Sequence, residues 1–92
     1  MRIRAVIAEP EWRLRIFAED GRTGMFDVRS YLDLSDFKPL KEVSEFLRVR
    51  TGGYYVEWAC GADLSADTLE SRMEWITRAG VIHGSYSFMS SF

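Results

Sequence analysis

The stretch that decides the fold is Trp12-Arg13-Leu14-Arg15-Ile16-Phe17-Ala18-Glu19-Asp20-Gly21. Its apolar residues Leu14, Ile16 and Ala18 recur at every second position, which is the period of a strand whose side chains leave opposite faces. Asp20-Gly21 then tolerates the positive φ of a tight turn between antiparallel strands. The stretch therefore predicts the first strand of a β-hairpin and its turn.

The register of this hairpin follows if Asp20 and Gly21 are its two loop residues. The facing pairs would be Glu19 with Arg22, Ile16 with Met25, and Leu14 with Asp27. On the N-terminal side, residues 2–8 form another predicted strand, turned by Glu9-Pro10-Glu11. Together these segments predict a three-stranded meander.

A second hairpin is predicted around Gly52-Gly53. With these two residues as the loop, one face pairs Thr51 with Tyr54, Val49 with Val56 and Leu47 with Trp58. The other face pairs Arg48 with Glu57 and Arg50 with Tyr55. The first face suits a core and the second suits solvent, so the division of faces favours this register.

Helical spacing is weaker and occurs mostly late in the chain. Residues 28–33 and 41–46 predict helical turns, and residues 66–79 predict the main helix, with Leu69, Met73 and Ile76 at i, i+4 and i+7. Ser65 or Asp67 would cap it. The predicted fold class is α+β: a mainly antiparallel sheet, built from the meander and the Gly-Gly hairpin, covered on one face by the C-terminal helix and short helical turns.

Length and composition limit the organisation to one domain. The chain has 92 residues, and 12 basic against 14 acidic side chains give a net charge of −2. Residues 1–80 are predicted to form the domain, and residues 81–92 an apolar, serine-rich tail that is an extra strand, an interface or disordered. The near-neutral charge excludes binding of nucleic acid by bulk charge alone. Charge alternation at residues 1–4, without an apolar signal or span, predicts a cytoplasmic protein.

Several weak motifs in a fixed order resemble a bacterial family catalogued as domain of unknown function 2442. They are Trp12-x-Leu14-x-Ile16, Asp20-Gly21, Asp27, Phe37, Leu40, Trp58-x-x-Gly61-Ala62-Asp63-Leu64 and Asp67-Thr68-Leu69. Ala18 stands where the family usually has an aromatic residue. The resemblance implies a small α+β domain without established catalytic residues, in some cases encoded beside small toxin-like partners.

No constellation in the sequence favours catalysis or a cofactor. Cys60 would need a base, and His83, the only histidine, lies beyond the helix. Two such residues are too few for zinc. Asp63, Ser65, Asp67 and Glu74 have calcium-loop spacing, but the position that needs glycine is Thr68. We therefore predict no metal, no cofactor and no enzymatic activity.

Asp27 is a further candidate for a catalytic residue. In the predicted register it shares a face with Leu14 and Met25, where a buried acid could act as a general base. The simpler interpretation is that Asp27 caps the helical turn that begins at Val28. The sequence favours the cap.

Two surfaces remain as candidates for binding. The first consists of the arginines on the predicted strands: Arg2, Arg4, Arg13, Arg15, Arg48 and Arg50. The second is the tail, through Tyr86, Phe88 and Phe92. The leading hypothesis is a non-catalytic module that binds another protein or a second copy of itself. The alternative is a nucleic-acid-binding accessory domain that uses the arginines. No membrane partner is expected.

Overall fold

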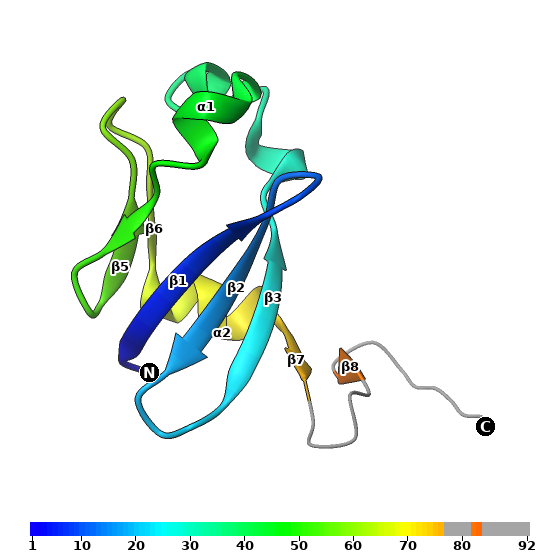
Figure 1. The fold of residues 1–92 in the computed structure, drawn as a ribbon, viewed down its shortest axis with the longest axis vertical. Helices are drawn as coiled ribbons and strands as arrows, with labels where there is room; N and C mark the ends of the chain where they lie inside the picture. The colour runs from blue at the N-terminus through cyan, green and yellow to red at the C-terminus, as the bar shows by residue number, and fades with distance from the viewer. Residues whose placement is uncertain (77–81, 84–92) are drawn as a thin grey trace.

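The computed structural model describes residues 1–76 and 82–83, which form two antiparallel sheets (Figure 1). The larger sheet has the strand order β1-β2-β3-β7-β8, and the smaller sheet has the order β4-β5-β6. The α+β class and the antiparallel pairing are confirmed. The predicted arrangement of one sheet under one helix is not, because the Gly-Gly hairpin belongs to a separate sheet.

The larger sheet begins with the predicted meander. Its strands are β1 (Ile3–Glu9), β2 (Arg13–Ala18) and β3 (Thr23–Asp27). β1 pairs with β2, and the register of this pairing shifts between Ile3 and Ala5. Short segments later in the chain, β7 (Glu74–Ile76) and β8 (Ile82–His83), extend the sheet beyond β3.

The register predicted for the first hairpin is wrong by one residue. Ile16 faces Gly24 rather than Met25, and Leu14 faces Phe26 rather than Asp27. The Ala18 N–H donates to the Arg22 carbonyl, so the loop has one residue more than Asp20-Gly21 alone. Because side chains alternate along a strand, this single step moves Phe26 into the core and Asp27 to the surface.

The smaller sheet contains β4 (Arg50–Thr51), β5 (Tyr55–Glu57) and β6 (Asp63–Ser65). Here the predicted register is wrong by two residues, since Thr51 pairs with Val56 and Arg50 with Glu57. The Thr51 hydroxyl accepts the Gly53 N–H at 3.1 Å and donates to the Tyr55 carbonyl at 2.8 Å, which places Gly53-Tyr54 at the turn. Gly53 has φ +100°, a value that suits glycine at such a turn.

A shift of two residues keeps the strand side chains on their predicted faces, but Tyr54, predicted on the core face, is 60% exposed at the turn. Val56 and Trp58 are buried and Val49 packs against the core, as predicted. The other face is also as predicted: Arg48, Arg50 and Tyr55 are exposed and Glu57 is half-exposed. The pairing of Leu47 with Trp58 is wrong, because Leu47 is 58% exposed at the end of a helix.

The helical segments are short. Residues Arg29–Tyr31 and Lys38–Lys41 form 3₁₀ turns, and α1 spans Val43–Phe46, so the two predicted regions of helical turns are confirmed. The main helix, α2 (Ala66–Arg72), begins as predicted, with the Ser65 hydroxyl accepting the Thr68 N–H at 3.1 Å.

The predicted continuation of this helix to residue 79 is wrong. Met73 is already extended, with ψ 151°, and residues 74–76 form β7. Met25 of β3 faces Glu74 of β7, so the main chain after Met73 completes the open edge of the meander. Main-chain pairing with β3 replaces the last turns of the predicted helix, and residues 77–79 lie outside the described residues.

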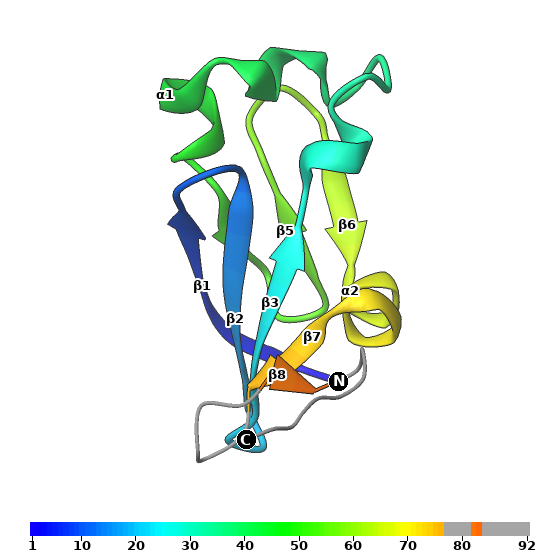
Figure 2. The same ribbon diagram turned by 90° about the vertical axis from the view of Figure 1, so that its right-hand side faces the viewer.

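One core lies between the two sheets (Figure 2). The larger sheet contributes Leu14, Ile16 and Phe26, and the smaller sheet contributes Val56, Trp58 and Leu64. α2 adds Leu69 at one end of the molecule, while α1 adds Phe46 at the opposite end, beside the turn between β1 and β2. In the part of the chain that the structure describes, none of the helices is long and apolar enough to cross a membrane.

Candidate interaction surface

The arginines of the larger sheet lie next to acidic side chains. Arg15 forms an ion pair with Glu9 at 2.9 Å, and Arg13 is the cross-strand neighbour of both Glu9 and Asp27. The Arg4 guanidinium lies 5.6 Å from the centre of the Phe17 ring. Positive charge on this face is therefore partly balanced by carboxylates.

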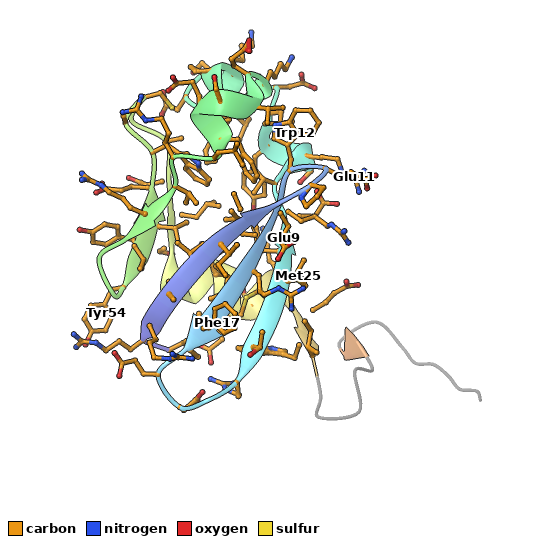
Figure 3. All side chains as sticks on the ribbon, viewed as in Figure 1. Glu9, Glu11, Trp12, Phe17, Met25 and Tyr54 are labelled. Carbon is orange, nitrogen blue, oxygen red and sulfur yellow. The ribbon has the colours of Figure 1, made fainter. Side chains whose placement is uncertain are left out.

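The other predicted arginines lie elsewhere on the molecule. Arg2 contacts Glu19 at 3.6 Å and donates to the Tyr54 hydroxyl at 3.2 Å, near the tip of the β4–β5 hairpin (Figure 3). Arg50 pairs with Glu57 at 2.8 Å, the partner predicted for Arg48. Three of the six predicted arginines, Arg2, Arg15 and Arg50, are thus paired with carboxylates. Tyr86, Phe88 and Phe92 of the tail lie outside the described residues.

Asp27 shapes a turn. Its Oδ1 accepts the Arg29 N–H at 2.9 Å, and its Oδ2 accepts from the Arg29 guanidinium at 2.7 Å. The side-chain hydrogen bond from Arg29 holds the pKa of Asp27 below its usual value. The carboxylate is exposed, one residue before the position where a helix cap would lie, and is poorly suited to act as a base.

The other chemical candidates are dispersed. Cys60 is exposed, and its thiol donates to the Asp36 carbonyl at 3.6 Å. Ser65 caps α2, whereas Glu74 belongs to β7, so the calcium-loop spacing is divided between two elements. No group of three or more His, Cys, Asp or Glu side chains able to hold a metal occurs within residues 1–76 and 82–83.

A groove that the sequence did not predict lies between the β1–β2 turn and α1. We call it the α1 groove. It has a volume of about 300 Å³, at the lower end of the range for ligand pockets, and is lined by Ala8, Glu9, Pro10, Glu11, Trp12, Val43, Phe46 and Leu47.

Trp12 fixes one wall of the α1 groove. Its indole N–H donates to the Leu40 carbonyl at 2.7 Å, which ties the β1–β2 turn to the 3₁₀ turn that precedes α1. Glu11 and Trp12 have φ values of 65° and 58°, in the left-handed region that ordinary side chains rarely adopt. This turn conformation places Trp12 beside α1 (Figure 3), and Glu11 also lines the groove.

The opposite wall consists of apolar side chains in contact with solvent. Val43 is 51% exposed and Leu47 is 58% exposed, and they are four residues apart at the two ends of α1, with buried Phe46 beside them. The i, i+4 spacing of Val43 and Leu47 is the signal in the sequence for this wall. The predicted hairpin hides this signal, because it places Leu47 in a strand.

The comparisons with known proteins identify one family. The chain matches the model of a family described as "Protein of unknown function (DUF2442)" over residues 3–73. No curated protein and no solved structure gives a significant match. The matched region contains every residue that lines the α1 groove.

Proposed function

The chain belongs to the DUF2442 family, and we propose that it is a non-catalytic protein-interaction module. The observation that carries this proposal is the α1 groove, whose lining is apolar apart from Glu9 and Glu11. Exposed Val43 and Leu47 each leave large apolar surface in water, and a partner that covers them would gain roughly 25 cal/mol for each Å² buried.

The groove is poorly equipped for catalysis. Of its two carboxylates, Glu9 is bound to Arg15, and Glu11 is exposed. Among the residues that the structure describes, neither a hydroxyl nor a thiol nor an imidazole lines the groove, so none of them supplies a nucleophile beside either acid. Cys60 lies in the turn between β5 and β6 and is not among the residues that line the groove. This arrangement supports binding rather than turnover.

Nucleic-acid binding remains the second candidate. Arg4, Arg13 and Arg48 favour it, because none of them forms an ion pair with another described residue. They belong to different regions of the chain, and the other three predicted arginines, Arg2, Arg15 and Arg50, are already paired with carboxylates. Three such cations would give a salt slope of only about −3 in log–log form, so tight binding at physiological salt is not expected.

The test is recovery and reconstitution of a complex. The tagged full chain is used to capture partners from the native host, with the small toxin-like proteins suggested by the family resemblance tested first. Each captured protein is then purified and mixed with the chain, and a stoichiometric complex is expected by size-exclusion chromatography with light scattering. Cys60→Ser should bind equally well. Absence of any reconstituted complex, or turnover that is lost in Cys60→Ser, would contradict the proposal.

A further inference from the structure

A strand edge with unpaired main-chain groups adjoins the α1 groove. β1 is the terminal strand of the larger sheet; β4 packs beside it, and at the start of β1 the Ile3 N–H donates to the Gly53 carbonyl. Among the described residues, only β2 bonds to the main chain of β1 from Arg4 to Glu9. An open edge of this kind can accept an added strand through main-chain hydrogen bonds.

The edge and the groove are continuous. Ala8 and Glu9 belong to β1 and also line the groove, and Pro10 follows directly. Ala8 faces Leu14, a core residue, so the groove opens on the core side of the strand's end. Side chains of a strand added to β1 would alternate between this side and the outer face that carries Ile7.

The charged side chains of the groove indicate which charge its partner should carry. The two charged side chains that line the groove, Glu9 and Glu11, are both acidic, and no described Lys or Arg lines it. Glu9 is paired with Arg15, whereas Glu11 is exposed, and its electrostatic contact is with Arg29. Because the charged lining is entirely acidic, the groove favours a basic ligand.

We propose that the α1 groove and the β1 edge bind an extended segment of a partner protein that places an apolar side chain, flanked by Lys or Arg, in the groove. This proposal rests on the function proposed above and specifies its site. The tail of a second copy is disfavoured, because residues 84–92 contain no Lys or Arg.

A displayed library of random peptides tests the chemistry without knowledge of the partner. Selection on the full chain should enrich peptides with alternating apolar residues flanked by Lys or Arg. Hydrogen exchange of the bound chain should show new protection in residues 5–9. Enrichment of acidic or uncharged peptides, no enrichment at all, or protection confined to other strands would overturn the proposal.

Four variants locate the site. Leu47→Glu should lower the affinity for a selected peptide about tenfold or more, while Leu34→Glu, at a similarly exposed leucine (53%), should leave it unchanged. Glu11→Lys should weaken basic peptides, and its control, Asp63→Lys on β6, should not. Circular dichroism verifies that each variant is folded. Equal binding by Leu47→Glu and Leu34→Glu would contradict the proposal.

These experiments distinguish the proposal that the α1 groove is the binding site from the broader proposal that the chain is an interaction module. A reconstituted protein complex that is insensitive to Leu47→Glu would leave the interaction module intact and remove the α1 groove as its site. Protection of residues 5–9 that rises with the concentration of the chain alone, without peptide, would show that a second copy occupies the edge and would overturn the assignment to a foreign partner.

Discussion

At the scale of single residues, two tryptophans connect main-chain segments that are distant in sequence. The Trp58 indole N–H donates to the Phe46 carbonyl at 2.9 Å inside the core, and the Trp12 indole donates to the Leu40 carbonyl. Each bond satisfies a carbonyl at or near the end of a short helix, where main-chain acceptors lack helical partners. These indoles therefore hold the region around α1 in place.

Trp58→Phe should destabilise the protein by about 1–3 kcal/mol, because the buried Phe46 carbonyl loses its donor. Trp75→Phe is the matched control. Trp75 is half-buried and lies 4.2 Å from the Arg22 guanidinium, so its replacement should cost less. Urea denaturation measures both, and equal losses for the two variants would contradict this role of Trp58.

Asp27 should give a small pH dependence. Its folded pKa lies below the ordinary value of 3.8 because of the hydrogen bond from the Arg29 side chain. Ionised Asp27 therefore stabilises the fold above the unfolded pKa, and this contribution is lost as the pH falls through the lower, folded pKa. Since both side chains are exposed, the contribution should be roughly a few tenths of a kcal/mol.

NMR titration of the Asp27 carboxyl group measures this effect directly. In Arg29→Gln, the midpoint should move upward toward the ordinary value, because the first cause of the lowered pKa is removed. A midpoint that is the same in both proteins would show that another group sets the pKa.

Residue patterns predicted the faces of strands better than their partners. Alternation identified Leu14, Ile16, Val56 and Trp58 as core residues, and all four are buried. The register depended on the loops. The first loop has one residue more than predicted after Ala18, so the observed register differs by one residue and Asp27 lies at the surface. In the second hairpin, the turn bonded to the Thr51 hydroxyl changes the register by two residues, so the strand residues stay on their predicted faces. Loop geometry of this kind depends on hydrogen bonds that a pattern of residue types does not specify.

At the scale of elements, the start of α2 was predictable and its end was not. Ser65 is a local signal that acts within one turn. The end at Arg72 depends on pairing of β7 with β3, a strand about fifty residues earlier in the chain. Leu69 and Met73 are both buried, as their helical spacing predicted, although Met73 already lies beyond the helix.

Ser65→Ala should destabilise the protein by about 1 kcal/mol, because the Thr68 N–H at the start of α2 loses its acceptor. Ser71→Ala is the control within the same helix, since the Ser71 hydroxyl donates to a carbonyl already inside α2. Chemical denaturation of the two variants distinguishes a cap from general helix propensity. A cost no greater for Ser65→Ala than for Ser71→Ala would exclude the cap.

At the scale of the whole molecule, stability depends on contact between the two sheets. Leu14 of the larger sheet and Leu64 of the smaller sheet belong to the same buried cluster. Leu14→Ala and Leu64→Ala should each cost about 2–5 kcal/mol and should each lower a single, shared unfolding transition. Leu34→Ala, at an exposed site, should change stability by less than about 0.5 kcal/mol.

Thermal unfolding followed separately by near-UV circular dichroism and by tryptophan fluorescence measures this coupling. The two signals should coincide in every variant. Separate transitions for the two signals would show that the sheets unfold independently.

The α1 groove depends on packing across the whole molecule, so patterns of neighbouring residues in the sequence did not predict it. Its walls come from the β1–β2 turn and from α1, which lie about thirty residues apart in the chain and meet through the bond from Trp12 to the Leu40 carbonyl. The predicted arginines, by contrast, are prominent in the sequence, and the fold pairs Arg2, Arg15 and Arg50 with carboxylates. Packing between distant parts of the chain therefore creates the groove and partly neutralises the arginines.

Binding of another protein through the α1 groove can be measured by isothermal titration calorimetry of the purified partner into wild type, Leu47→Glu and Leu34→Glu. We expect wild-type affinity for Leu34→Glu and a loss of about tenfold or more for Leu47→Glu. Equal affinity for all three proteins would show that the partner does not bind in the α1 groove.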